Sequence, residues 1–296
     1  MPGHDGPVYR PFGYRRLLTS PATTYGDRWQ ENAARHAALY EAVYGLLGTT
    51  ATILPFADAY HGTPSATTFT TQRATSTGVN ATFTWSSAPS GWTTALNLGS
   101  PGSYQGVIPI LRFDGAANEA DSPDNAYWSR AAGAFSVGAW VNMVDATNSA
   151  ILSKYTATGD LREWRFILNA SDQLQLILSD ETDATTPNAT IDSAADDALS
   201  QNAWVFVVAT YDGSANASGI NLYQDGAVVA STDTDDANFT SLRDTTSVVE
   251  LGDTENANFF DGTMAGGPLG PFFTQIALTA DQVARLYNVG RRALAL

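Results

Sequence analysis

The sequence predicts a mainly β protein, an antiparallel sandwich of short strands with one helix near each end of the chain. Three observations favour this fold. Apolar and polar residues alternate in many short segments, Asp, Asn and Gly residues separate these segments, and only two stretches have helical spacing. The chain has 296 residues, 44% of them hydrophobic, so it is large enough to bury a sizeable core.

The clearest strands are expected in the C-terminal region, residues 107–296. Apolar residues occupy every second position of 135–143 and of 204–208, so each segment has one apolar face. The pair Asp225-Gly226 lies between two apolar pairs, and both residues tolerate the positive φ of a two-residue hairpin turn. This region is therefore predicted to be the sandwich.

Two helices are predicted. The first follows Asp27, which can cap it, and ends at Gly48. A capping box formed by Thr279 and Gln282 starts the second, which Gly290 ends. The first helix has apolar or aromatic residues at alternating spacings of four and three: Trp29, Ala33, His36, Tyr40, Val43 and Leu47.

Composition divides the chain into three regions. Residues 1–48 form a docking arm and helix, 49–106 a Thr/Ser-rich small β region, and 107–296 the sandwich. The arm is rich in arginine and aromatic residues, a composition suited to binding another surface. Packing of the arm and helix on the chain's own body is the alternative. The residues expected in assembly contacts are Tyr9, Arg10, Phe12, Tyr14, Arg15, Trp29, His36 and Tyr40.

Charge and composition exclude several classes of function. The net charge is −15, and residues 107–296 hold 25 acidic against nine basic residues, so nucleic acid and anionic lipid are poor partners. There is no cysteine, and the three histidines lie within the first 61 residues, which leaves the sandwich without a thiolate site or a Ser-His-Asp triad. No apolar stretch is long enough to insert into a membrane. The N-terminus has no secretory signal pattern, so we expect synthesis and folding in a cytoplasm.

An ordered set of short motifs runs through the C-terminal region: LRFDG (111–115), FSVGAWV (135–141), ILSK (151–154), WVFVVATYDG (204–213), LYQDG (222–226), FFDG (259–262) and ALT (277–279). Through this set, residues 108–292 resemble the laminin-G-like, concanavalin A-like jelly-roll domains of the lectin/glucanase type. One departure is the segment 264–270, which replaces the acidic pair usual in the family and weakens any transfer of ligand residues from that strand. The resemblance implies a fold that hosts lectins, adhesion modules, hydrolases and structural domains.

A calcium site is the first candidate that the resemblance implies. In similar sandwiches the loop after the first strand and the loop before the FFDG strand approach each other and hold a structural Ca²⁺. Oxygen ligands from Asp and Asn side chains suit this cation. The alternative is that these residues form turns and bond their own backbone. The candidate ligands are Asp114, Asn118, Asp253, Asn258 and Asp261.

A carbohydrate site is the second candidate. Lectins place an aromatic ring against a sugar face and bond its hydroxyls with Asp and Asn groups. The aromatic residues near predicted loops are the candidates for such a platform, and burial in the core is their alternative role. They are Tyr127, Trp128, Tyr155 and Trp164.

Hydrolysis of a glycan requires two carboxyl groups in one groove. Glu250 has the opposite strand parity to Asp253 and Glu255, so a regular strand would direct it to the other face. Asp253 and Glu255 share a parity, but they lie in an Asn/Asp-rich segment that is typical of a loop. The protein is therefore expected to have no catalytic site.

These observations together predict a non-enzymatic structural protein of a virion surface, such as a bacteriophage capsid decoration, tail or fibre protein. Its partners would be capsid or tail proteins, copies of itself and glycans of a host or its environment. A glycan-binding adhesin of a prokaryotic cell surface is the alternative interpretation, and a glycoside hydrolase is the third.

Overall fold

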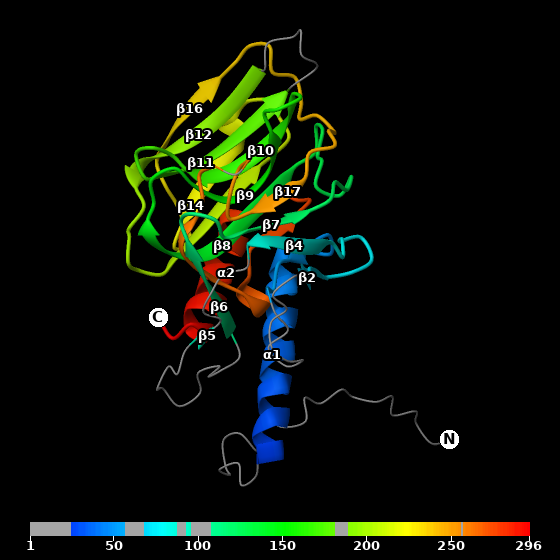
Figure 1. Ribbon diagram of the computed structural model, residues 1–296, viewed down its shortest axis with the longest axis vertical. Coiled ribbons are helices and arrows are strands. Elements are labelled where there is room, and N and C mark those ends of the chain that lie inside the picture. Colours follow the sequence, from blue (N-terminus) through cyan, green and yellow to red (C-terminus); the bar gives the residue numbers. More distant parts are fainter. Residues whose placement is uncertain (1–24, 57–67, 88–92, 96–107, 181–188, 256) are drawn as a thin grey trace, which may run out of the picture.

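The computed structural model describes residues 25–56, 68–87, 93–95, 108–180, 189–255 and 257–296. Two antiparallel sheets pack face to face, and two helices lie on the side of one sheet (Figure 1). The predicted β-sandwich with an N-terminal and a C-terminal helix is confirmed. Two helix bounds differ from the prediction, because the first helix already begins at Tyr25 and the second continues past Gly290 to Ala293. None of the described helices is both long and apolar enough to cross a membrane.

Sheet A is the sheet on which the helices pack. Its main path runs β15 (Ala227–Val228), β14 (Ile220–Gln224), β13 (Val205–Tyr211), β8 (Phe135–Asp145), β18 (Asp261–Ala265), β6 (Ile108–Asp114) and β5 (Thr93–Ala95). Three further strands join it through β8: β19 (Phe272–Thr274), β1 (Thr52–Ile53) and β3 (Gln72–Arg73). The predicted turn at Asp225-Gly226 connects β14 and β15, and both residues have positive φ, 49° and 81°.

Sheet B forms the opposite layer. Its order is β16 (Ser231–Asp235), β12 (Ala189–Ala198), β11 (Gln173–Asp180), β10 (Leu161–Leu168), β9 (Ser149–Thr156), β17 (Val249–Leu251), β7 (Glu119–Ser122), β4 (Thr82–Ser87) and β2 (Thr68–Thr70). Strand β17 is short and lies in the middle of the sheet, where it pairs with β9 on one side and β7 on the other.

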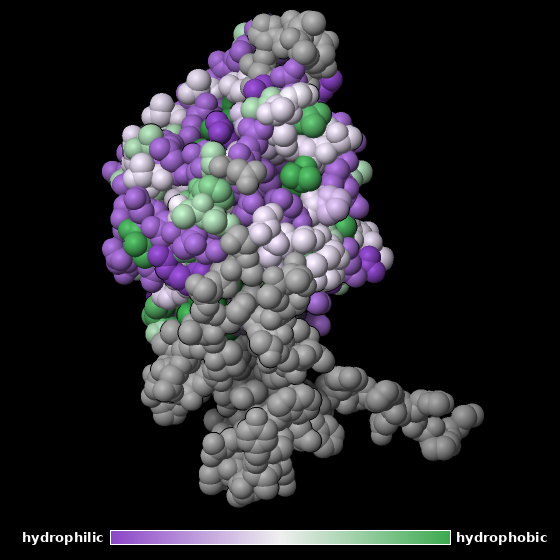
Figure 2. All heavy atoms as spheres, viewed as in Figure 1, coloured by the Kyte–Doolittle hydropathy of each residue, from purple (hydrophilic) through white to green (hydrophobic). Residues whose placement is uncertain are grey.

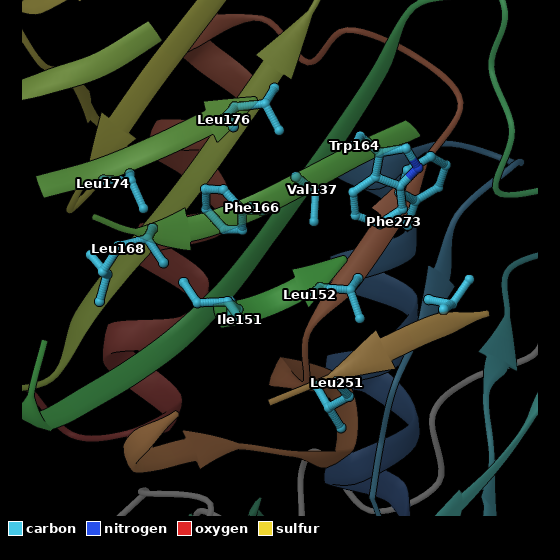
Figure 3. Close-up of a cluster of buried hydrophobic side chains, with 14 of the residues drawn as sticks. Val137, Ile151, Leu152, Trp164, Phe166, Leu168, Leu174, Leu176, Leu251 and Phe273 are labelled. Carbon is cyan, nitrogen blue, oxygen red and sulfur yellow. The ribbon is translucent and has the colours of Figure 1, made fainter. Parts of the chain in front are cut away.

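The main core fills the space between the two sheets. Leu152, Phe166 and Leu251 extend into it from sheet B, and Val137 and Phe273 from sheet A (Figure 3). All five are completely buried. Burying a large apolar side chain of this kind contributes roughly 1.5–3 kcal/mol, so this layer is the principal source of stability.

A second core lies between sheet A and the helices. The C-terminal half of α1 (Tyr25–Leu47) and the helix α2 (Ala280–Ala293) pack on the outer face of sheet A, with Val43 and Leu286 among the buried residues. Trp140, whose parity is opposite to that of the main core face, lies under α2 and stacks on Tyr287 at 5.6 Å between ring centres. A Cβ atom at Gly290 would lie 2.3 Å from the Trp140 indole nitrogen, so glycine permits this close packing. Sheet A is thus covered on both faces.

The described part of the Thr/Ser-rich region, 49–106, is continuous with the sandwich. Strands β1, β3 and β5 belong to sheet A, and β2 and β4 belong to sheet B. The side chains of Phe69, Phe83 and Trp85 enter the main core. The apolar positions of this region therefore fill the same core as the C-terminal strands.

Candidate functional site

The outer face of sheet B carries none of the described helices, which pack on sheet A, and it is called the open face below. Its middle is nevertheless buried at Ser153 and Glu250. In a strand, the residue next to a core residue points to the opposite face. The residues beside Leu152, Phe166 and Leu251 therefore point outward. The strand register aligns these outward positions in one row across all nine strands: Thr68, Thr84, Asp121, Glu250, Ser153, Arg165, Ile177, Asp192 and Thr234.

The surface of the sandwich is mostly hydrophilic in the view of Figure 2, where hydrophobic residues are scattered singly. Among the described residues, the large hydrophobic side chains that are exposed are Val144, Val228 and Leu296. None of them belongs to the row on sheet B. A ligand of the open face would therefore be recognised mainly through polar groups.

Four carboxylates form an acidic cluster in the middle of this face: Glu119, Asp121, Glu250 and Asp253. Glu119 and Asp121 are two residues apart on β7 and point outward, and Glu250 pairs with Asp121 in the register of β7 and β17. Carboxylate oxygens of Glu119, Asp121 and Asp253 lie within 4.8 Å of one another. Three of the four side chains belong to residues that are at least nine-tenths buried.

The structure corrects the expectation that Glu250 and Asp253 lie on opposite faces. Strand β17 ends at Leu251, and Gly252 follows with a φ of 84°, a left-handed conformation that turns the chain. Both Glu250 and Asp253 consequently border Asp121. The alternation of apolar and polar residues does not predict this turn.

Two hydrogen bonds fix the Glu250 carboxylate. The Ser153 hydroxyl donates to Oε2 at 3.0 Å, and the backbone N–H of Glu255 donates to Oε1 at 2.9 Å. Burial nevertheless raises the pKa of Glu250 to about 7, with the nearby charges of Asp121 and Glu255 adding to the effect. Burial also raises the pKa of Asp121 to about 6, and the charge of Glu119 contributes.

Without divalent cations, stability is expected to fall as the pH rises from about 4.5 to 7, because the pKa of Glu250 is higher in the folded than in the unfolded chain. The folded state therefore binds the proton more tightly, and ionisation of the carboxyl destabilises it. At about 1.4 kcal/mol per pKa unit, the contribution of Glu250 is roughly 3 kcal/mol. Urea unfolding in the presence of EDTA measures this effect. The free energy of unfolding of Glu250→Gln, minus that of the wild type, should be more positive at pH 8 than at pH 5. An identical difference at both pH values would contradict it.

Tyr155 lies on the same open face, two residues along β9 from Ser153. The Arg165 guanidinium carbon is 4.6 Å from the centre of the Tyr155 ring, and the Arg162 Nε donates a hydrogen bond to its hydroxyl at 3.1 Å. The ring is half-buried. Among the four aromatic residues predicted to form a sugar platform, Tyr155 is the one that the structure places on this face.

The other three aromatic candidates are corrected, because they belong to the main core. Trp128 and Trp164 are completely buried, and the Trp164 indole N–H donates to the Trp128 carbonyl at 3.0 Å. The Tyr127 hydroxyl donates to the Thr50 carbonyl at 2.6 Å and is 2.9 Å from that of Phe273. Their rings fill the end of the space between the sheets, so none of the three can stack on a sugar.

The five predicted calcium ligands are divided by the fold. Their two loops do meet, since Asp114 and Asp261 are register partners in β6 and β18. However, one Asp114 oxygen accepts three backbone N–H groups of its own turn, including that of Asn118, and Asp261 pairs with Arg112 at 2.7 Å. Asn258 adopts a left-handed turn conformation. Of the five, Asp253 alone joins the acidic cluster.

Most of the predicted assembly contacts lie outside the described residues. These are Tyr9, Arg10, Phe12, Tyr14 and Arg15, together with the side chain of Trp29. His36 and Tyr40 are half-buried on α1, with their rings 5.0 Å apart in an edge contact, and Tyr40 stacks on Tyr44. The role of these residues in assembly stays a prediction.

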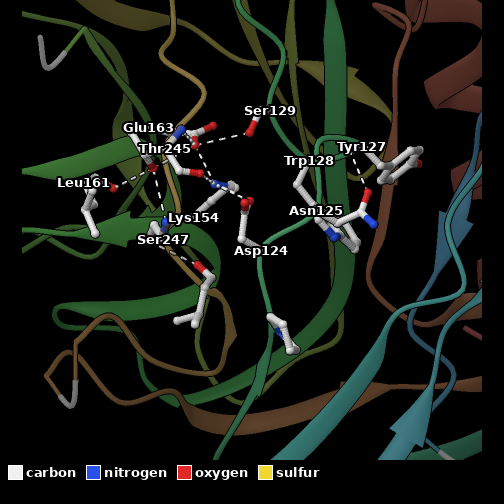
Figure 4. A network of polar contacts seen from close by, with 12 residues as sticks. Asp124, Asn125, Tyr127, Trp128, Ser129, Lys154, Leu161, Glu163, Thr245 and Ser247 are labelled. Carbon is white, nitrogen blue, oxygen red and sulfur yellow. Dashed lines mark hydrogen bonds and ion pairs between the residues drawn. The ribbon is translucent and has the colours of Figure 1, made fainter.

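Sequence reasoning missed a buried ion pair between Lys154 and Glu163 (Figure 4). The Lys154 Nζ lies 2.5 Å from Glu163 Oε1 and 3.1 Å from Asp124, and donates to the Thr245 carbonyl at 2.7 Å. Both side chains of the pair are completely buried. Burial raises the pKa of Glu163 in spite of the neighbouring Lys154. This network connects the β9–β10 hairpin to the segment around Thr245.

The two sheets, with one covered and one open face, define a jelly-roll sandwich. Residues 114–269, more than half of the chain, match the family described as the concanavalin A-like lectin/glucanases superfamily. The chain belongs to this superfamily, and its fold is that of a lectin-like domain.

Two solved structures are similar to this chain at low sequence identity. The chain is similar to the botulinum neurotoxin serotype G binding domain, with a TM-score of 0.51 and 13% identity over 82% of this chain and 51% of that one. It is also similar to the binding domain of Paraclostridial mosquitocidal protein 1, with a TM-score of 0.48 and 14% identity over 75% of this chain and 51% of that one. The chain thus spans about half the length of these structures. No curated protein sequence matches it.

Proposed function

We propose that this protein is a non-enzymatic, lectin-like module that binds glycans through the outer face of sheet B. The observation that carries the proposal is the half-buried Tyr155 ring, which lies beside two arginines on that face. Two residues along the same strand, Ser153 donates a hydrogen bond to Glu250 of the acidic cluster. An aromatic ring suits the apolar face of a sugar, and charged side chains suit its hydroxyls. Tyr155 and the two arginines are only partly buried, so a polymer has access to them.

The module is proposed to work on the surface of a virion, attached through its N-terminal region to capsid or tail proteins and to copies of itself. Two features support this placement. Helix α1 extends away from the sheets toward its N-terminal end (Figure 1), and the arm before it is rich in arginine and aromatic residues. Both helices lie on sheet A, which leaves sheet B to face outward. An adhesin of a prokaryotic cell surface is the alternative. Immunogold labelling distinguishes the two, since label on virions supports the first placement and label on the cell surface supports the second.

Replacing Tyr155 by Ala is expected to weaken glycan binding at least tenfold, because the stacking surface and the position of two arginines are lost. A glycan array identifies the ligand, and calorimetry then measures the affinity of wild type and variant. Val228→Ala, at an exposed edge position of sheet A, is the matched control and should leave the affinity unchanged. Absence of binding to every glycan, or equal affinity of a folded Tyr155→Ala variant, would contradict the proposal.

A glycoside hydrolase is the second candidate, favoured by one observation. The turn at Gly252 gathers Glu250, Asp121 and Asp253 on the open face, and paired carboxyl groups are what glycoside hydrolysis requires. Release of reducing ends from the bound glycan, abolished by Glu250→Gln, would establish this activity. Binding without release supports the non-enzymatic module.

A further inference from the structure

We infer that Glu119, Asp121 and Asp253 bind one divalent cation, with Ca²⁺ as the best match to their chemistry. This site differs from the loop set that the sequence suggests, with which it shares only Asp253. It does not depend on glycan binding, and it assigns the cation a structural role in sheet B.

The spacing of the three carboxylates suits one shared ion. Calcium binds oxygen ligands at about 2.3–2.6 Å, so two oxygens on opposite sides of the ion are up to about 5 Å apart. The oxygens of Glu119, Asp121 and Asp253 all lie within 4.8 Å of one another. An ion among them would therefore contact all three without a large movement of the backbone.

Glu119 gives an independent indication of a ligand. The residue is only 6% exposed, and its carboxylate has no hydrogen bond or ion pair within the described part of the chain. It is directed at the carboxylates of Asp121 and Asp253. Asp121 has a side-chain hydrogen bond with Ser86, but its Oδ1 is buried without a hydrogen-bond partner. Buried charges of this kind are strongly unfavourable unless a counter-charge compensates them.

The described ion pairs supply no such counter-charge, since none involves Glu119, Asp121 or Glu250. The ligand set consists of oxygens without His or Cys, which favours a hard cation over zinc or copper. Calcium accepts irregular geometry and six to eight ligands, whereas Mg²⁺ demands a near-ideal octahedron. Backbone carbonyls and water would complete the coordination.

The position of the site explains what the ion would stabilise. Strand β17 pairs with β7 through three residue pairs and with β9 through two, so the middle of sheet B has few backbone contacts. The ion would link β7 to the turn that follows β17. It would thereby join the strands β2, β4 and β7 to the remainder of the sheet.

The test uses the full chain, freed of metal with a chelator and then titrated with CaCl₂. Calorimetry should show one Ca²⁺ per chain, and the melting temperature should rise with the Ca²⁺ concentration, as expected for a ligand of the folded state. Asp121→Asn and Glu119→Gln should each weaken Ca²⁺ binding at least tenfold. Asp114→Asn, in the loop set, is the matched control and should bind Ca²⁺ like wild type.

Two results would overturn the inference. One is a wild-type protein whose melting temperature and heat signal do not respond to millimolar Ca²⁺. The other is loss of binding in Asp114→Asn with binding retained in Glu119→Gln. Glu119→Gln keeps the size of the side chain, so it serves as the decisive variant should Asp121→Asn fail to fold. No glycan is present in these titrations, so failure of the lectin proposal leaves their outcome unaffected.

Discussion

Replacing Lys154 by Met is expected to lower the free energy of unfolding by about 3–5 kcal/mol, the range for breaking a buried ion pair from one side. The substitution leaves the Glu163 carboxylate in the interior without its positive partner. Glu163 would keep the hydrogen bonds that its Oε1 accepts from Thr245, but its Oε2 has no hydrogen-bond partner. Urea unfolding at pH 7 measures the change.

The double variant Lys154→Met/Glu163→Gln distinguishes a loss of charge balance from a loss of packing. The amide introduced at position 163 keeps an oxygen acceptor for Thr245 and carries no charge. The double variant should therefore recover most of the stability that Lys154→Met alone loses. A double variant as unstable as the sum of the two single variants would contradict this account.

Replacing Trp164 by Ala is expected to destabilise the protein by about 3–5 kcal/mol, because it opens a large cavity in the core. The Trp164 ring is completely buried, stacks on Phe273 at 5.3 Å and lies 5.9 Å from the ring of Phe135. The substitution also removes the hydrogen bond that the Trp128 carbonyl accepts from the Trp164 indole N–H. Thermal and urea unfolding both report the loss.

Tyr155→Ala is the matched control for this prediction, since the sequence suggested the same role for both aromatic residues. Tyr155 is half-buried on the open face, so its removal should destabilise the protein by about 1 kcal/mol or less. Equal losses for the two variants would show that the distinction between a core and a surface aromatic residue is wrong.

Local signals predicted most of the fold. The alternation in 135–143 predicted β8, the pair Asp225-Gly226 predicted the β14–β15 turn, and the capping box at Thr279 is formed as expected. Each depends on residues close together in the sequence. Strand β12 was missed because its inward residues include small ones, such as Ser193 and Ala195, which give a weak apolar pattern.

The candidate site was predicted less well because it depends on irregular backbone. The register of β9 and β10 shifts between Arg162 and Trp164, so Glu163 and Trp164 are both buried while Arg162 and Arg165 lie near Tyr155. Strict alternation gives no sign of this bulge. The turn at Gly252 likewise places Glu250 and Asp253 beside Asp121, although strict alternation predicts that they lie on opposite faces.

The loop residues illustrate a different limit. An Asp that binds a cation and an Asp that bonds its own turn have the same neighbours in sequence, Gly and Asn. In the structure, three backbone N–H groups occupy the Asp114 carboxylate. Residue type alone does not separate these two roles.

The double coverage of sheet A restricts where this protein can change without losing its fold. Strand β13 is buried along its whole length, and β8 along nearly all of it, so a substitution there disturbs one of two packed layers. The row across sheet B has the main core behind it but no described helix in front. Libraries that randomise the outward positions of β10, β11 and β12 should therefore yield mostly folded variants, which makes this face the natural place to engineer a new binding specificity.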